Sequence, residues 1–194
     1  RFETGLLNGS AFEGKAQWIT HVPDKATPVS PVLYKDFVVQ GNVKKARLYA
    51  TALGMYEAEI NGEPVDDTYF HPGWTNYRKR LQYQTCAVTL HSGKNHVALT
   101  LANGWYKGKL GFMPTPNNYG DTNAALAALC ITYEDGHERN GSVSMKAGFA
   151  RPVRCRLRKF TMAKRRTLRQ TPPHRSPPDC LTTALTRLSG RKTS

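Results

Sequence analysis

The residues best suited to bind a small polar ligand lie in, or just before, one irregular stretch that runs from Trp105 to Asn123. Sugar sites combine flat aromatic faces with a few amide or carboxylate groups. An irregular stretch of this length is usually functional or disordered, and its aromatic and amide content favours a binding loop. The alternatives are core packing for the rings and internal hydrogen bonding for the polar groups. The candidate carbohydrate-binding residues are Asn103, Trp105, Tyr106, Asn118, Tyr119 and Asp121.

Carboxylates provide candidates for a metal site and for catalysis. Asp66, Asp67 and Asp121 could offer hard oxygen ligands to calcium, although consecutive carboxylates more often only solvate a turn. Glu57 and Glu59 are two residues apart on a predicted strand, so they share a face about 7 Å apart. A catalytic pair needs a cleft and one raised pKa, which an open strand face does not provide. We therefore predict no catalytic residue, and calcium is the one candidate cofactor.

The elements that must position these residues are short strands. Alternating or apolar segments are bounded by turn residues, and Asn61-Gly62 favours a hairpin because both residues accept positive φ cheaply. The segment 124–129 is the only one that could instead form a helix. This spacing predicts an all-β antiparallel sandwich. The predicted strands are 16–19, 32–39, 46–52, 55–60, 81–88, 96–101 and 125–133.

Charge divides the chain near residue 140. Residues 1–140 carry 14 basic and 13 acidic residues, whereas residues 141–194 carry 14 basic residues and one acid, Asp179. The overall charge of +14 is therefore no evidence of a nucleic-acid partner. The basic, proline-containing segment 141–194 has no sustained periodicity and cannot offset its ordering entropy. We predict that it is disordered.

Two further properties narrow the class of protein. No apolar run approaches the roughly 20 residues that cross a bilayer, so we expect no membrane partner. The four cysteines (Cys86, Cys130, Cys155 and Cys180) are widely spaced and form no CxxC pair. They match neither a zinc site nor a dense disulfide framework. Reduced thiols in a cytoplasmic protein are the simplest interpretation, although the sequence does not fix the compartment.

Several runs resemble the amino-terminal domain of bacterial α-L-rhamnosidases. They are 46–62 (ARLYATALGMYEAEING), 72–85 (PGWTNYRKRLQYQT), 103–112 (NGWYKGKLGF) and 118–121 (NYGD). The resemblance covers residues 1–140 and implies a jelly-roll-like sandwich over 16–140, preceded by a linker, 1–15, from an earlier module. It also implies a partner, because the family carries its acid–base pair in an (α/α)6 barrel that normally belongs to the same chain.

The resemblance implies a non-catalytic module that supports substrate positioning or binds rhamnose-containing carbohydrate. Because this chain resembles only one module, no catalytic residue of the family is assigned to it. Two alternatives remain open. The module could be purely structural and pack on the barrel, or it could be a fragment of an α-L-rhamnosidase that hydrolyses terminal α-L-rhamnose. The expected partners are rhamnose-containing glycosides and the barrel.

The segment after residue 140 departs from the family. Where related proteins continue with a sequence resembling Glu-Ile-Tyr-Asn-Gly-Glu-Thr, this chain has Lys159-Phe160-Thr161-Met162-Ala163-Lys164-Arg165. Back-translation of these residues in a shifted frame permits Ile-Tyr-Asn-Gly-Glu-Thr. We therefore hypothesise a truncated, frameshifted fragment whose tail is translated out of frame from near residue 141. The alternative is a basic arm that binds nucleic acid through phosphates. The other reading frames of the coding DNA decide between them.

Overall fold

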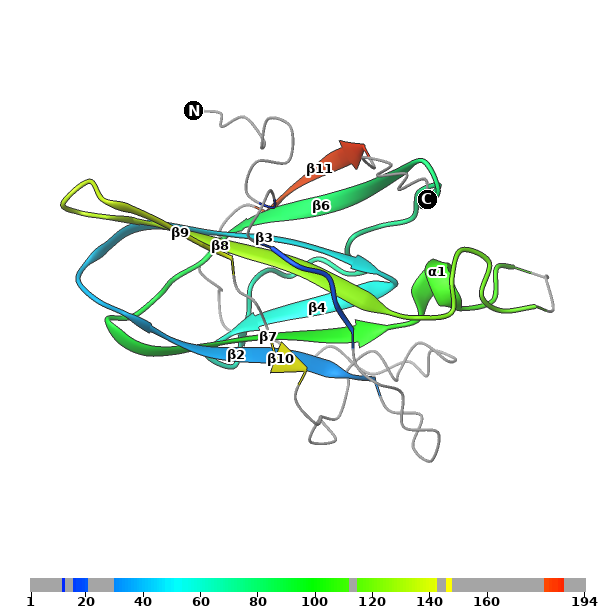
Figure 1. The fold of residues 1–194 in the computed structure, drawn as a ribbon, viewed down its shortest axis with the longest axis horizontal. Coiled ribbons are helices and arrows are strands. Elements are labelled where there is room, and N and C mark those ends of the chain that lie inside the picture. The colour runs from blue at the N-terminus through cyan, green and yellow to red at the C-terminus, as the bar shows by residue number, and fades with distance from the viewer. Residues whose placement is uncertain are drawn as a thin grey trace, which may run out of the picture.

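The chain folds into two antiparallel sheets that pack face to face (Figure 1). This computed structural model describes residues 12, 16–20, 30–111, 115–142, 146–147 and 180–186. The first sheet has the order β1-β8-β3-β6-β11, with β9 also paired to β8, and the second has the order β10-β2-β7-β4-β5. The first sheet contains β1 (Ile19–Thr20), β3 (Val43–Leu53), β6 (Arg80–Ala87), β8 (Ala124–Tyr133), β9 (Glu138–Ser142) and β11 (Cys180–Thr186). The second contains β2 (Val32–Val39), β4 (Met55–Ile60), β5 (Glu63–Pro64), β7 (Gly93–Ala102) and β10 (Lys146–Ala147), and one helix, α1 (Gly104–Lys107), follows β7. The predicted all-β antiparallel sandwich is confirmed.

The hairpin predicted at Asn61-Gly62 joins β4 to β5. Asn61 has φ 53° and Gly62 has φ 85°, so both central residues adopt the left-handed conformation that this turn requires. Ile60 pairs with Glu63 across the turn. Most of β4, however, pairs with β7 in the register Met55 to Ala102 through Ile60 to Val97, so the hairpin ends one edge of the second sheet.

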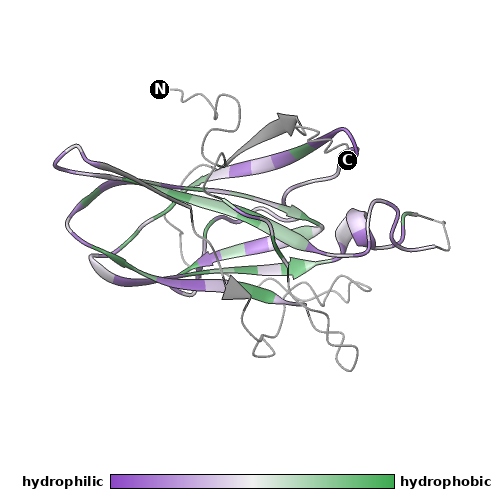
Figure 2. Cartoon of the chain, in the orientation of Figure 1, coloured by the Kyte–Doolittle hydropathy of each residue, from purple (hydrophilic) through white to green (hydrophobic). Residues whose placement is uncertain are grey.

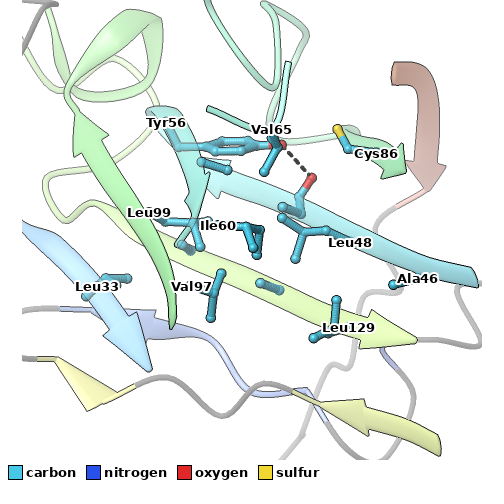
Figure 3. Packing of buried hydrophobic residues seen from close by; sticks show 14 of the residues in the cluster. Leu33, Ala46, Leu48, Tyr56, Ile60, Val65, Cys86, Val97, Leu99 and Leu129 are labelled. Carbon is cyan, nitrogen blue, oxygen red and sulfur yellow. Dashed lines mark hydrogen bonds between the residues drawn. The ribbon is translucent and has the colours of Figure 1, made fainter. Parts of the chain in front are cut away.

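The core lies between the two sheets and follows the period of two along each strand (Figure 3). Leu48 of the first sheet and Leu99 of the second are fully buried there. Burying a leucine stabilises a fold by roughly 1.5–3 kcal/mol. Alternate positions of β3 and β8 are alanines, which allow these neighbouring strands to present a close-packed surface. Apolar residues accordingly concentrate along the central strands in Figure 2.

The first sheet is buried on its outer face as well. Thr51 and Tyr83 point away from the core yet have no exposed surface, and Leu126 is buried on the same side. The ring of Phe12 packs edge-on against Tyr83 with 5.8 Å between centroids. A strand buried on both faces has a continuous apolar sequence, which explains why residues 124–129 lack alternation and form part of β8 rather than a helix.

Part of the basic segment is described, and one expectation about the thiols needs correction. Within the predicted disordered tail, residues 141–142, β10 and β11 are strands, and β11 pairs with β6 from Arg80 to Cys86. Backbone pairing with a sheet edge supplies the hydrogen bonds that composition could not reveal. The rest of 141–194 lies outside the described residues. Cys86 is disulfide-bonded, so reduced thiols are wrong for this residue. No helix among the described residues is long and apolar enough to cross a membrane.

Candidate carbohydrate-binding surface

Two loops meet beside the sandwich and form what we call the paired-loop surface. One is loop 65–79, between β5 and β6, and the other is loop 103–123, between β7 and β8, which begins with α1 (Figure 1). The indole of Trp74 stacks on that of Trp105 with 6.1 Å between ring centroids and 7° between planes. Arg78 Nη2 donates a hydrogen bond of 3.3 Å to the Asn118 carbonyl oxygen. These contacts join segments that lie about thirty residues apart or more in the sequence.

The accessible aromatic area of this surface belongs mainly to loop 65–79. Trp105 is half-buried and contacts both Phe70, at 5.8 Å between centroids, and Trp74. Trp74 is 57% exposed and Tyr69 is 69% exposed. Neither Trp74 nor Trp18, which is 45% exposed, belongs to the core. Trp74 lies outside because it follows Gly73, whose φ of 93° turns the chain, and because it covers Trp105.

The two tyrosines predicted to bind carbohydrate form the base of the surface rather than its outer layer. Tyr106 and Tyr119 stack on each other with 6.5 Å between centroids, and both contact buried Tyr77, at 5.3 and 5.0 Å. The Tyr77 hydroxyl donates to the Gly73 carbonyl oxygen at 3.0 Å. Burial, and then the neighbouring Tyr119, raise the pKa of Tyr77 to about 12. Sequence reasoning missed Tyr77, although its proximity to Trp74 in the run 72–85 was a usable signal.

The polar candidates differ in whether their side chains already form hydrogen bonds within the protein. Asn118 Nδ2 donates to the Gly108 carbonyl oxygen at 3.2 Å, which closes loop 103–123 on itself. Asn103 and Asp121 are exposed near the two ends of this loop, and Asp121 Oδ1 accepts from Thr122 Oγ1 at 2.9 Å. The structure therefore brings Trp105, Tyr106, Asn118 and Tyr119 together, whereas no described contact joins Asn103 or Asp121 to that group.

One side chain that sequence reasoning missed secures the end of this loop. Asn123 Nδ2 donates to the carbonyl oxygens of Leu53 and Ala102 at 3.1 and 3.2 Å. Thr20 Oγ1 donates to the Asn123 carbonyl oxygen at 2.7 Å. The loop therefore begins and ends against fixed backbone, which favours a surface formed before any ligand binds.

The three metal candidates are in unlike environments. Asp66 has a side chain only 5% exposed, and its Oδ1 accepts from the backbone nitrogen and the hydroxyl of Thr68 at 2.9 and 2.6 Å. Its Oδ2 faces His71 Nδ1 at 3.7 Å. Oδ2 also lies 3.4 Å from Cys86 Sγ of β6, so both oxygens of Asp66 face protein partners. Asp67 and Asp121 are exposed. Within the described ranges, no three histidine, cysteine, aspartate or glutamate residues come together as a metal group.

Other described titratable groups lie on β4 and beside it. Glu57 and Glu59 lie on the face of β4 opposite its core-facing residues, as predicted. Burial lowers the pKa of His71, and the Asp66 carboxylate partly offsets this by raising it. Burial also raises the pKa of Tyr56, with a smaller contribution from Asp66. Both effects arise beneath loop 65–79.

Taken together, two antiparallel sheets and an aromatic surface on two connecting loops define a β-sandwich module. The sequence profile of the alpha-L-rhamnosidase N-terminal domain matches residues 41–142. The chain belongs to this family of domains.

Named relatives give the same family. An alpha-L-rhamnosidase of Streptomyces avermitilis is 52% identical over 96 residues, which are 48% of this chain and 9% of that protein. One of Formosa agariphila is 37% identical over 147 residues, which are 70% of this chain and 16% of that protein. The chain thus spans less than a fifth of the length of either relative.

Solved structures of rhamnosidases contain the same fold. The native enzyme from Aspergillus terreus superposes with a TM-score of 0.64 and 37% identity, covering 71% of this chain and 16% of that one. The Streptomyces avermitilis alpha-L-rhamnosidase complexed with L-rhamnose superposes with a TM-score of 0.55 and 45% identity, covering 57% of this chain and 11% of that one. In both cases the match is one part of a much larger enzyme.

Proposed function

We propose that this module binds the sugar of rhamnose-containing glycosides on its paired-loop surface and has no hydrolytic activity of its own. The observation that carries the proposal is the Trp74–Trp105 stack, with most of Trp74 open to solvent. An indole held by a second indole offers a rigid apolar face that loses little conformational freedom when a sugar ring packs on it. In a longer rhamnosidase such a surface would position substrate for a catalytic domain.

Exposed polar groups near the two ends of loop 103–123 suit the same ligand. Asp121 already accepts one hydrogen bond, and a carboxylate has capacity for several more. Asn103 is exposed at the start of the same loop, where it could contact sugar hydroxyls. If calcium takes part, the exposed carboxylates of Asp67 and Asp121 would hold it through hard oxygen ligands. In this proposal hydrolysis belongs to the longer rhamnosidases. Hydrolysis with inversion at the anomeric carbon needs two carboxyl groups on opposite sides of a bound sugar.

A fluorescence titration of the full 194-residue chain with methyl α-L-rhamnoside tests the proposal. We expect saturable quenching of tryptophan emission and roughly tenfold weaker binding in Trp74→Ala, which corresponds to about 1.4 kcal/mol. Trp18→Ala is the matched control, because Trp18 is a partly exposed tryptophan outside the paired-loop surface, and it should bind like the parent. Titrations with calcium and with a chelator measure the contribution of the metal. Absence of saturation in both solutions would refute sugar binding.

A structural role is the second candidate. Tyr69 and Trp74 are large and exposed, and exposed apolar patches often mark interfaces with other domains. The chain covers only 9% to 16% of the two curated relatives, so a neighbouring domain could cover this surface in a longer protein. In that case Trp74 emission would resist a soluble quencher in the longer protein, and the isolated chain would not bind methyl α-L-rhamnoside.

A further inference from the structure

A polar network links exposed Thr68 to the nearly buried side chains of Asp66 and His71 within loop 65–79. Thr68 Oγ1 is 2.6 Å from Asp66 Oδ1 and 2.5 Å from His71 Nε2. The ring of His71 also packs against Tyr56 of β4, with 5.5 Å between centroids. The network therefore joins the loop to the second sheet through one histidine.

Proton counting fixes the direction of each hydrogen bond in this network. The Thr68 hydroxyl has one proton, and it donates that proton to Asp66 Oδ1. The hydroxyl oxygen then accepts from His71, which places the proton of the neutral imidazole on Nε2. Thr68 is thus a relay between two side chains of its own loop, and neither contact can form without its hydroxyl group.

The backbone from Phe70 to Gly73 is held from several directions. The His71 carbonyl oxygen accepts from the Tyr56 backbone nitrogen at 2.9 Å. The Pro72 carbonyl oxygen accepts from Gln84 Nε2 of β6 at 3.1 Å. The Gly73 backbone nitrogen donates to the Phe70 carbonyl oxygen at 2.7 Å. This segment therefore contacts both sheets.

Trp105 contacts the two aromatic residues at the ends of this segment. Phe70 precedes His71 and lies 5.8 Å from Trp105, whereas Trp74 follows Gly73 and stacks on the same indole. Phe70 has a positive φ of 66°, a conformation that costs free energy in a bulky residue and persists only where surrounding contacts impose it. A shift of His71 would move both rings.

We propose that Thr68 and His71 are positioning residues, which act through the 70–73 backbone to hold Phe70 and Trp74 against Trp105. The effect on sugar binding rests on the proposed function, whereas the positioning of the aromatic rings does not. Loss of the Thr68 hydroxyl separates the Trp74 and Trp105 indoles and thereby weakens sugar binding, although neither Thr68 nor His71 contacts the sugar.

A pair of substitutions at one position tests this in the full chain. Thr68→Val keeps the side-chain shape and removes the hydroxyl, whereas Thr68→Ser keeps the hydroxyl. Stacked indoles couple their ultraviolet transitions, so circular dichroism reports the Trp74–Trp105 pair directly. We expect Thr68→Val to lose this coupled signal and to bind methyl α-L-rhamnoside about tenfold more weakly, and Thr68→Ser to recover both. Thr89→Val, at an exposed position outside both loops, should change neither.

A second variant keeps the test decisive if Thr68→Val does not fold. Tyr77→Phe removes the hydrogen bond to the Gly73 carbonyl oxygen and should reduce the coupled signal in part. Unchanged dichroism in every folded variant overturns the positioning role. If the parent chain binds no sugar but the dichroism responds as expected, the proposed function fails and the positioning role is supported.

Discussion

Replacing Tyr56 by phenylalanine removes a hydroxyl group that joins the two sheets. Tyr56 belongs to β4 (Figure 3). Its hydroxyl lies 2.8 Å from Gln84 Oε1 of β6 and 3.0 Å from the Ala50 carbonyl oxygen of β3. The variant loses one buried hydrogen bond, worth about 1 kcal/mol, and leaves a buried acceptor unsatisfied, which costs about 1–3 kcal/mol. We expect a loss of about 2 kcal/mol in the free energy of unfolding and a fall in Tm of roughly 4–8 °C.

Urea denaturation followed by circular dichroism measures this change. The m-value should stay constant, because the surface exposed on unfolding does not change. Tyr34→Phe is the matched control, since Tyr34 is exposed on the second sheet, and it should alter stability by less than about 0.5 kcal/mol. A double-mutant cycle with Gln84→Leu should give a coupling of about 0.5–3 kcal/mol. If Tyr56→Phe is as stable as Tyr34→Phe, the hydroxyl does not join the sheets.

Three further changes follow from the backbone and from shifted pKa values. Gly54→Ala should cost about 2–3 kcal/mol in urea unfolding, because φ is +128° and the new Cβ would lie 2.4 Å from the Ala102 carbonyl oxygen; Gly62→Ala, with open space around it, should cost only about 1 kcal/mol, and equal costs would contradict the crowding. Because burial lowers the pKa of His71 below 6.5, the unfolded chain binds the proton more readily than the folded chain does. The free energy of unfolding should therefore fall as the pH drops below 6.5. His71→Gln should lose this pH dependence, and a variant with the same pH profile as the parent would contradict the role of His71. Because burial raises the pKa of Tyr77 to about 12, the unfolded chain loses this proton at a lower pH than the folded chain. The free energy of unfolding should therefore decline by about 2 kcal/mol between pH 10 and 12. An ultraviolet titration that finds Tyr77 ionising near pH 10 would contradict its burial.

Local sequence patterns were sufficient to predict most of the fold. The segment Val32–Val39 forms β2 within the predicted bounds, and Asn61-Gly62 adopts the predicted turn, because period-two alternation and positive φ are properties of neighbouring residues. The helix α1 was missed, because four residues, Gly104–Lys107, are too few to show a helical period. Pairing of β11 with β6 joins segments about a hundred residues apart, which no local pattern encodes.

The candidate surface was only partly predictable, for the same reason. Loop 103–123 was recognisable by its composition, but the exposure of Trp74 depends on a stack with Trp105, thirty-one positions away. Asp66 and Asp67 are identical in type, yet one is buried beside His71 and the other is exposed. Residue type predicts which chemistry is available, whereas tertiary contacts decide which of two like residues is free to perform it.

Nuclear magnetic resonance of the indole groups tests the sugar-binding proposal most directly. The chain has three tryptophans, Trp18, Trp74 and Trp105, so a nitrogen-labelled sample gives one indole resonance for each. Titration with methyl α-L-rhamnoside should shift the Trp74 and Trp105 signals saturably and leave Trp18 unchanged. Three unmoved signals at a saturating ligand concentration, or a shift confined to Trp18, would contradict binding at the paired-loop surface.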